Sequence, residues 1–202
     1  MLKYGLDISE HNEDVMRSPA AWDALKNSQY KDFIILRRGY GVVPTEDKCY
    51  INYYHSARNI GISDISSYWF SYALDADEAR AEAQNYLKLT QHDGVLLNAV
   101  IMDLEDNNKF QRYGISLTKK FVNQQIEAFI RVLKDAGLNT AVYSSQWVFQ
   151  DLVDWDLIKE LGCGVWNAAY SQDDAIKGWL FQYTDRHYIK QYGPFDCNIM
   201  RV

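Results

Sequence analysis

The hydrophobic residues of this 202-residue chain form short apolar runs separated by stretches with helical spacing. Runs rich in β-branched and aromatic residues predict buried strands at 2–8, 33–37, 65–73, 98–107 and 140–144. Capping residues and apolar residues three and four positions apart predict helices at 19–26, 50–60, 75–90 and 117–136. Strands that alternate with helices in this way are typical of a parallel sheet or barrel.

The pattern changes after residue 145. A helical turn at 147–149 and a short helix at 156–161 lead to three strand candidates at 163–167, 179–183 and 196–201. The connections between these last strands are too short for regular covering helices. We therefore predict one α/β domain over residues 1–202, an irregular TIM-like barrel of five strand–helix units followed by three strands.

The composition is sufficient for one large hydrophobic core and argues against several classes of binding partner. Hydrophobic residues make up 48% of the chain, yet the mean hydropathy is negative and no apolar run approaches the length of a membrane span. The net charge of -6 argues against nucleic acid and against attachment to an anionic membrane surface. Cys49, Cys163 and Cys197 lack metal-ligand spacing, so we expect reduced thiols. The N-terminal residues contain no signal-peptide core.

The candidate chemistry gathers in the stretch 98–107, where acids follow an apolar strand. Side chains alternate faces along a strand, so Asp103 and Glu105 are expected to point the same way, roughly 7 Å apart along the chain. Repulsion between two carboxylates raises the pKa of at least one, which keeps a carboxylic acid protonated near neutral pH for general-acid catalysis. Two solvated acids at a strand end are the plainer interpretation of this pair alone.

The other strand ends supply polar and aromatic residues to the same end of the barrel, where the active sites of such barrels lie. The residues that the pattern places there are Asp7, Arg37, Tyr72, Asp103, Glu105, Tyr143, Trp166 and Gln182. Closure of the barrel makes the first and last strands neighbours, which brings Asp196 towards Asp7. The sequence therefore predicts an acidic cup with aromatic walls, a combination that suits a carbohydrate because apolar sugar faces stack on rings.

Segments along the whole chain carry a resemblance to a known enzyme family. They are GLDIS at 5–9, FIILRRGYG at 33–41, YWFSYA at 68–73, MDLED at 102–106, AG at 136–137 with VYSS at 142–145, WLFQYT at 179–184 and FDCN at 195–198. In their order and spacing they resemble the glycoside hydrolase family 25 muramidases, the Chalaropsis-type lysozymes, which include many bacteriophage endolysins. The (β/α)5(β)3 barrel of that family agrees with the strand count above.

The resemblance implies hydrolysis of the β-1,4 bond between N-acetylmuramic acid and N-acetylglucosamine in bacterial peptidoglycan, which lyses the cell wall. Glu105 matches the proton donor of the family and Asp103 matches its partner carboxylate. Asp7 and Asp196 match two further acids of the cleft. The residues expected to bind substrate are Tyr72, Tyr143, Trp166, Arg37 and Gln182, with a core role as the alternative for the three aromatic residues. We expect neither a metal nor a cofactor.

The residues leave parts of the mechanism open. Asp103 either stabilises positive charge at the sugar ring or orients the 2-acetamido group of the substrate. The alternating geometry favours a spacing between the two carboxyls wider than the about 5 Å of direct nucleophilic attack. Asp7 and Asp196 either tune charge and bind hydroxyls or form structural pairs with Arg37.

The chain departs from the family in details that concern subsites rather than the catalytic acids. Residues 9–12 lack the Trp that many relatives carry shortly after the Ser, and Cys197 stands where Leu is common. The segment that precedes Tyr68, residues 62–67, is polar and about one residue longer than its counterpart in the family. The histidines lie in dissimilar, mostly polar contexts and are expected at the surface without a metal: His11, His55, His92 and His187.

Three competing interpretations stay open at this point. A chitinase-like N-acetylhexosaminidase also places D-x-E at a strand end, but Ala99 and Ile101 occupy positions where its motif has further Asp residues. A metal-dependent hydrolase would usually show His ligands near the strand ends. An inactive peptidoglycan-binding module on the same barrel would not need both Asp103 and Glu105.

The expected biological setting follows from the resemblance and from the charge. A muramidase without a signal peptide fits a phage-type enzyme that is made in the bacterial cytoplasm, is released at lysis and acts at the cell wall, or an extracellular catalytic domain. Its expected partners are the glycan strands of peptidoglycan. The acidic chain has no evident means of attachment to an anionic wall, so we expect a separate C-terminal wall-binding domain outside this chain.

Overall fold

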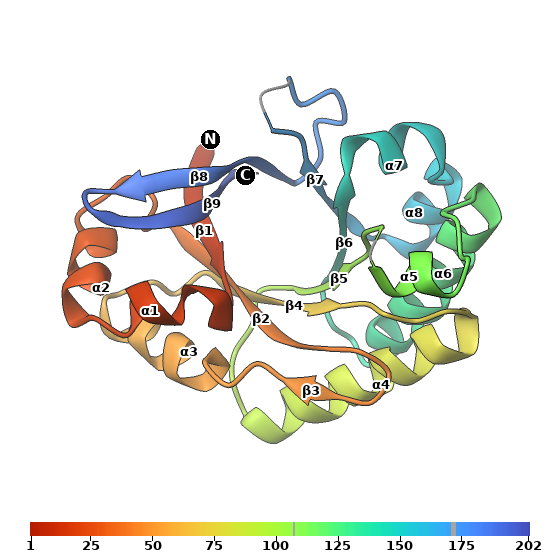
Figure 1. Ribbon diagram of the computed structural model, residues 1–202, viewed down its shortest axis with the longest axis horizontal. Coiled ribbons are helices and arrows are strands. Elements are labelled where there is room, and N and C mark those ends of the chain that lie inside the picture. The colour runs from red at the N-terminus through yellow and green to blue at the C-terminus, as the bar shows by residue number, and fades with distance from the viewer. Residues whose placement is uncertain (107, 171–172) are drawn as a thin grey trace.

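The computed structural model describes residues 1–106, 108–170 and 173–202, whose strands form one nine-stranded sheet. The strands are β1 (Leu2–Ile8), β2 (Phe33–Tyr40), β3 (Thr45–Glu46), β4 (Ile65–Phe70), β5 (Val100–Asp103), β6 (Thr140–Ser145), β7 (Gly164–Ala168), β8 (Leu180–Ile189) and β9 (Tyr192–Arg201). The sheet closes into a barrel because β1 pairs with β2 on one side and with β9 on the other (Figure 1). The two-residue β3 extends this ring beyond the end of β2.

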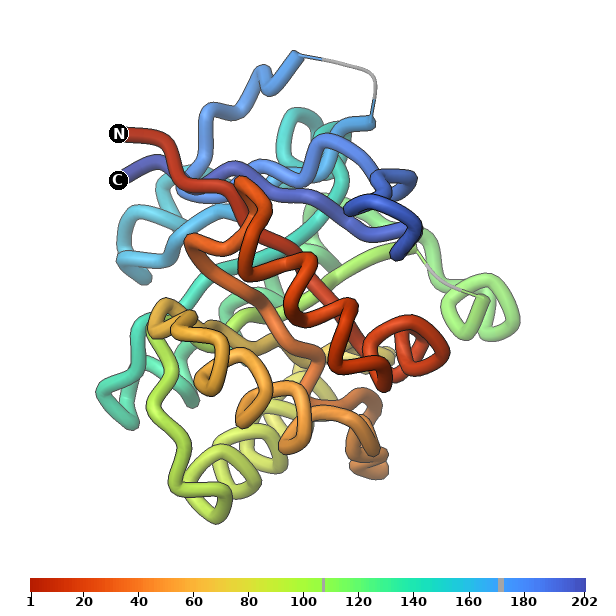
Figure 2. Tube along the Cα trace, turned by 90° about the vertical axis from the view of Figure 1, so that its left-hand side faces the viewer, coloured from red at the N-terminus to blue at the C-terminus, as the bar shows by residue number. Residues whose placement is uncertain are grey.

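Strand direction changes only at the last strand of the described barrel. Neighbouring barrel strands from β1 through β8 run parallel, whereas β9 runs antiparallel to both β8 and β1. The short β3, outside the closed ring, pairs antiparallel with the last residues of β2. Gly5 allows the closure, because a Cβ at this position would lie 2.4 Å from the carbonyl oxygen of Phe33 in β2. The two termini meet beside each other (Figure 2), where the N-terminal amine of Met1 donates to the carbonyl of Val202 at 3.0 Å.

Helices follow the first five barrel strands and cover the outside of the barrel (Figure 1). They are η1 (Glu10–Asn12), α1 (Glu13–Met16), α2 (Pro19–Lys26), α3 (Tyr50–Asn59), α4 (Ala76–Asp93), α5 (Asn108–Arg112), α6 (Lys119–Asp135), α7 (Gln146–Asp151) and α8 (Trp155–Leu161). Helix α4 begins where the Asp75 carboxylate accepts the backbone N–H groups of Asp77 and Glu78, and it ends at Gly94 in a left-handed conformation. Helix α6 begins likewise at Thr118, whose hydroxyl accepts the N–H of Phe121.

Three hydrophobic clusters hold these layers together. One fills the barrel interior and includes Phe33, Ile101 and Leu180. A larger one packs α4, α6, α7 and α8 against the outer face of the barrel, and another packs α1, α2 and α3 against the opposite side. The interior cluster closes the bottom of the barrel and leaves its upper end to polar and aromatic side chains.

The predicted irregular barrel of five strand–helix units and three further strands is confirmed, with differences at particular ends. Strand β2 continues to Tyr40, where the sequence predicted a loop after Arg37. Its two arginines are tolerated because Arg37 binds Glu10 and Asp47, while Arg38 binds acids on the outside of the barrel. Consecutive strand residues point to opposite faces, so the two arginines have different partners. The pairing of β2 with β4 also shifts register between residues 37 and 39.

Further differences concern the bounds of strands β5, β8 and β9. Strand β5 ends at Asp103, so Glu105 lies beyond the strand that was expected to carry it. Strands β8 and β9 are longer than predicted and form a hairpin. In the described part of the chain, no helix has the length and apolar character needed to cross a membrane. The thiols of Cys49, Cys163 and Cys197 are free.

Candidate active site

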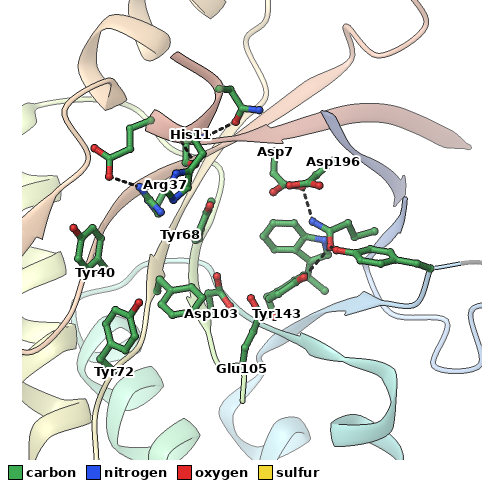
Figure 3. A pocket seen from close by; sticks show the side chains of 17 residues that line it. Asp7, His11, Arg37, Tyr40, Tyr68, Tyr72, Asp103, Glu105, Tyr143 and Asp196 are labelled. Atoms are coloured by element: carbon green, nitrogen blue, oxygen red, sulfur yellow. Dashed lines mark hydrogen bonds and ion pairs between the residues drawn. The ribbon is translucent and has the colours of Figure 1, made fainter. Parts of the chain in front are cut away.

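A pocket of about 500 Å³ opens at the C-terminal ends of the parallel strands (Figure 3). All nine residues that the sequence placed at this end line it: Asp7, Arg37, Tyr72, Asp103, Glu105, Tyr143, Trp166, Gln182 and Asp196. The strands before β8 contribute from their C-terminal halves or from the segments that follow them, whereas Gln182 lies near the start of β8 and Asp196 in the middle of β9. The barrel itself thus gathers side chains that are far apart in sequence. The predicted acidic cup with aromatic walls is therefore present.

Asp103 and Glu105 form a carboxyl pair on one side of the pocket (Figure 3). Asp103 is 4% exposed at the end of β5, and Glu105 is half-buried just beyond it. The two carboxyls interact with each other through a shared hydrogen bond, which contributes to the pKa of both. Glu105 is not part of the strand, and its side chain points towards Asp103 (Figure 3).

Burial controls the protonation of this pair. Desolvation, and then the negative charge of Glu105, hold the pKa of Asp103 well above its usual value. Desolvation also raises the pKa of Glu105, although its hydrogen bond with Asp103 acts in the opposite direction. Two interacting carboxylates cannot both ionise cheaply in this site, so burial and mutual repulsion favour a proton on the pair.

Asp7 and Asp196 form a second carboxyl pair across the pocket (Figure 3). They lie directly opposite each other in the antiparallel pairing of β1 with β9, as barrel closure predicted. Burial raises the pKa of Asp7 to about 6. Burial and the charge of Asp7 raise the pKa of Asp196 to about 8. At neutral pH, Asp7 is therefore the ionised member and Asp196 the protonated one, which donates its hydrogen bond to Asp7.

Two side-chain amides fix the charge on Asp7. The Nε2 of Gln182 and the Nδ2 of Asn198 donate to the same oxygen, Oδ2 of Asp7, at 2.8 and 2.7 Å. The Nε1 of Trp166, which can only donate, lies 2.8 Å from Oδ1 of Asn198 and thus orients that amide with its nitrogen towards Asp7. Both amides present N–H groups, so Asp7 accepts best as a carboxylate.

Two tyrosine hydroxyls orient the other amide. Tyr143 and Tyr170 donate to Oε1 of Gln182 at 2.7 and 2.6 Å, which directs its Nε2 towards Asp7. Tyr143 is 7% exposed and its ring lies against Trp166, with 4.4 Å between the ring centroids. These aromatic residues therefore support the pocket floor as well as lining it.

Arg37 lines the pocket but pairs with neither carboxyl pair. Its Nη2 lies 2.7 Å from Glu10 and its Nε lies 3.0 Å from the buried carboxylate of Asp47. A structural pairing of Arg37 with Asp7 or Asp196, the alternative considered from the sequence, does not occur. The guanidinium is largely neutralised by its own partners, which leaves the cup acidic.

Tyr72 forms the wall farthest from the Asp7 pair (Figure 3). Its ring meets those of Phe70 and Tyr40, with centroids 5.0 and 6.0 Å away. Its backbone N–H donates to the buried Glu82 and its carbonyl accepts from Lys109, both at 2.9 Å. These contacts hold a half-buried aromatic ring at the pocket edge.

Sequence reasoning missed several residues that line the pocket: Ser9, Glu10, His11, Asn12, Tyr40, Tyr68, Phe70 and Tyr170. The first four belong to the capped turn η1 directly after β1, where the Ser9 hydroxyl and the Asn12 side chain form a capping box. The S-x-x-N spacing after Asp7 was the available signal for this turn. His11 is exposed, as expected of the histidines, but it stands at the pocket wall.

The site is built for proton and charge chemistry by carboxyls. It combines a proton-retaining pair, an ionised acid with a fixed position and aromatic walls. Among the described residues, no group of three or more His, Cys, Asp or Glu side chains has the geometry to hold a metal ion.

The family model described as Glycosyl hydrolases family 25 matches residues 6–192. No curated protein matches the chain by sequence. Among solved structures, the modular autolysin LytC from Streptococcus pneumoniae superposes with a TM-score of 0.81 at 23% identity, over 99% of this chain and 47% of its own. A family 25 glycosyl hydrolase from Bacillus anthracis gives 0.72 at 16% identity, over 98% of this chain and 88% of its own.

The catalytic domain of an endolysin from a bacteriophage of Listeria monocytogenes gives a TM-score of 0.71 at 19% identity, over 100% of this chain and 94% of its own. The chain therefore spans less than half of LytC and nearly all of the endolysin domain. At these identities the superpositions show a shared barrel fold.

Proposed function

The chain belongs to glycosyl hydrolases family 25, and on this basis we propose that it is a muramidase. It hydrolyses the β-1,4 bond between N-acetylmuramic acid and N-acetylglucosamine in peptidoglycan and acts at the bacterial cell wall. The observation that carries the proposal is the pair of buried carboxyls, Asp103 and Glu105, which retains a proton inside a pocket with aromatic walls.

Glu105 is the general acid in this proposal. It is more exposed than Asp103, so its carboxyl can reach a glycosidic oxygen in the pocket. Its raised pKa favours the protonated form, which proton donation to the leaving oxygen requires. When Glu105 gives up its proton, the Asp103 hydrogen bond stabilises the resulting carboxylate.

Asp103 acts beside the acid rather than as a nucleophile. A direct nucleophile stands about 5–5.5 Å from the acid and on the other face of the sugar. Asp103 and Glu105 lie on the same side of the pocket and interact with each other (Figure 3). This supports the role in which Asp103 orients the 2-acetamido group of the substrate and shares the proton of Glu105.

Asp7 supplies negative charge on the opposite side of the pocket. Its carboxylate is held in place by Gln182 and Asn198, so it does not need to reorganise when positive charge develops on the sugar ring. Asp196 keeps its proton and hydrogen-bonds to Asp7, which limits the repulsion in the acidic cup. Tyr72 lines the same pocket and contacts the substrate there, whereas Arg37 lines the pocket with its guanidinium bound to Glu10 and Asp47.

The substrate class draws support from one relative. LytC has been solved in complex with a synthetic peptidoglycan ligand, at 24% identity to this chain. The pocket fits such a ligand chemically, because sugar rings combine hydroxyls for carboxylates with apolar faces for Tyr72 and Trp166. Glycan strands of peptidoglycan are therefore the proposed partner.

The test is a digestion of purified peptidoglycan with the chain and with Glu105→Gln, followed by borohydride reduction and mass spectrometry of the new ends. Glu160→Gln makes the same change at a side chain that is 62% exposed and serves as the control. We expect muramitol ends from the wild type and the control. Hydrolysis by Glu105→Gln should fall about 10²–10⁴-fold, the usual loss for a missing general acid.

Two outcomes would reject the proposal. Glucosaminitol ends would identify a glucosaminidase and favour the chitinase-like alternative. Absence of new reducing ends from a wild-type protein that still binds the glycan would identify a binding module.

A further inference from the structure

A second hollow of about 350 Å³ adjoins the active-site pocket. The two hollows, together termed the groove, share three lining residues: Glu105, Tyr143 and Tyr170. Beyond the shared residues, the second hollow is lined by the first turns of α7 and by the segment after β7, residues 168–170. Helix α7 begins directly where β6 ends, beside the mouth of the barrel (Figure 1).

The acids divide the groove into two unlike parts. Asp7, Asp103 and Asp196 line only the first pocket, whereas Glu105 lines both. In glycoside hydrolysis, positive charge develops on the sugar whose C1 is attacked, and the acid protonates the oxygen between the two sugars. The charged sugar therefore lies in the acidic pocket, and the leaving sugar lies on the far side of Glu105.

Trp147 is the aromatic platform of this second hollow. It is 46% exposed, although its neighbours Val148 and Phe149 are buried and anchor α7 to the core. Ser145 and Gln150 add polar groups beside it, suited to sugar hydroxyls and an acetamido group. A rigid, exposed indole flanked by hydrogen-bonding side chains matches a pyranose, which has apolar faces and a polar edge.

We infer that Trp147 binds the N-acetylglucosamine residue that leaves on cleavage, and that the hollow formed by α7 and residues 168–170 is its subsite. This inference rests on the proposed muramidase activity, because that activity makes N-acetylglucosamine the leaving sugar. Tyr170 then acts at the junction: its hydroxyl is bound to Gln182 and its ring, 42% exposed, faces both parts of the groove.

The first experiment measures hydrolysis of the tetrasaccharide GlcNAc–MurNAc–GlcNAc–MurNAc at its central bond. Trp147→Ala should lower kcat/KM about tenfold, carried mainly by KM, because the ring binds the sugar before and during the reaction alike. Trp147→Tyr should restore most of the loss. The pH profile should keep its shape in both variants, which separates lost stacking from a disturbed Glu105. Trp155→Ala, at an indole 38% exposed on α8, is the matched control.

The second experiment measures binding without hydrolysis. In the Glu105→Gln background, titration with the tetrasaccharide should change the tryptophan fluorescence, and adding Trp147→Ala should weaken binding about tenfold. Unchanged binding together with unchanged kcat/KM would overturn the subsite while muramidase activity stands. Glucosaminitol ends from the wild type would reject both the proposed function and the assigned sugar. A loss in Trp147→Ala that Trp155→Ala reproduces would also overturn the inference.

Discussion

The two carboxyl pairs of the pocket consist of the same chemical groups but differ in their hydrogen-bond partners and in their protonation. Each pair joins a nearly buried acid, Asp7 or Asp103, to a half-buried one. Asp7 receives two amide donors on one oxygen, whereas Oδ1 of Asp103 has no hydrogen-bond partner among the described residues. The amides favour a charge on Asp7, and their absence at Asp103 favours a proton.

This contrast shows that neighbours, rather than the acids themselves, assign the roles. In the pair of β5, burial dominates and favours a proton, because no side-chain amide of the described residues donates to Asp103. The pair of β1 and β9 divides into an ionised and a protonated member because Gln182 and Asn198 select Asp7. The pocket thus separates an acid function from a charge-stabilising function within one cup.

The largest expected effect is that of Asp103→Asn, which removes one acid from the proton-retaining pair. We expect hydrolysis to fall about 10²–10³-fold, within the range of lost acid–base assistance. The Asn side chain donates to the Glu105 carboxylate and lowers the pKa of Glu105, so the remaining activity should disappear at a lower pH than in the wild type. The pH dependence of kcat on soluble glycan strands measures this shift.

Asp106→Asn is the matched control, because Asp106 is an exposed acid directly after Glu105. It should leave both the rate and the pH profile unchanged. A wild-type profile in Asp103→Asn would contradict the idea that the pair shares a proton.

The next effect tests the charge-holding pair through Gln182→Leu. Loss of one donor raises the pKa of Asp7 above about 6, so fewer molecules carry the ionised Asp7 near neutral pH. We expect the rate at pH 6 to fall about fivefold, because a rise of one pKa unit lowers the ionised fraction of Asp7 from about a half to about a tenth. The rate should recover as pH rises. The buried hydroxyl of Tyr143 also loses its acceptor, at a cost of about 1–3 kcal/mol in the free energy of unfolding.

Urea denaturation measures the loss in the free energy of unfolding, and the acid limb of the pH–rate profile measures the shift in the pKa of Asp7. Gln191→Leu, at an exposed turn between β8 and β9, should change neither. An acid limb that does not move would mean that Asp7 does not carry the required charge.

The two pairs also show which features of the site could be predicted from the sequence. Alternating strands and helices predicted the barrel, and barrel closure predicted that Asp196 meets Asp7. The apolar run before Asp103 predicted an acid at a buried strand end. These features follow from local pattern and from topology, which the chain specifies by periodicity and turn residues.

What the sequence could not supply was the choice of partners. The donors to Asp7 come from β8 and β9, and their orientation depends on Trp166 and Tyr143 from other strands. The contact of Glu105 with Asp103 depends on β5 ending two residues before Glu105. Such partners are set by register and side-chain packing across the closed barrel, and no spacing along the chain encodes them.

A smaller effect on catalysis is expected from Arg37→Met, because the guanidinium serves neither pair directly. The rate should change by about threefold or less, while the free energy of unfolding falls by about 3 kcal/mol, the usual result when a buried ion pair loses one partner. The carboxylate left without its cation is Asp47, which is 4% exposed. Chemical denaturation and initial rates on the same samples separate the two quantities.

Arg186→Met provides the comparison, since its ion pair with Asp185 is at the surface. This control should lose at most a few tenths of a kcal/mol, about what an exposed pair contributes. A large loss of rate in Arg37→Met at unchanged stability would instead place Arg37 in direct contact with the reacting sugar.

The smallest effect is a change in how stability depends on pH in Asp196→Asn. The pKa of Asp196 is about 8 in the folded protein against 3.8 for an unperturbed Asp, so between these values the folded state holds a proton that the unfolded chain has lost. The contribution of Asp196 to the free energy of unfolding is therefore highest below about pH 4 and declines as pH rises towards 8. The Asn variant cannot titrate, yet it still donates to Asp7.

Thermal unfolding from pH 4 to pH 8 measures this slope. The wild-type and Asp196→Asn melting temperatures should agree near pH 4, and the variant should be about 2–4 °C more stable at pH 8, the shift that about 1 kcal/mol gives a chain of this size. The exposed Asp23→Asn should follow the wild type. Asp103 and Glu105 still titrate in every variant, so a residual slope should persist in Asp196→Asn. Parallel curves for Asp196→Asn and wild type would show that Asp196 is ionised in the folded protein, and the two pairs would then hold charge in the same way.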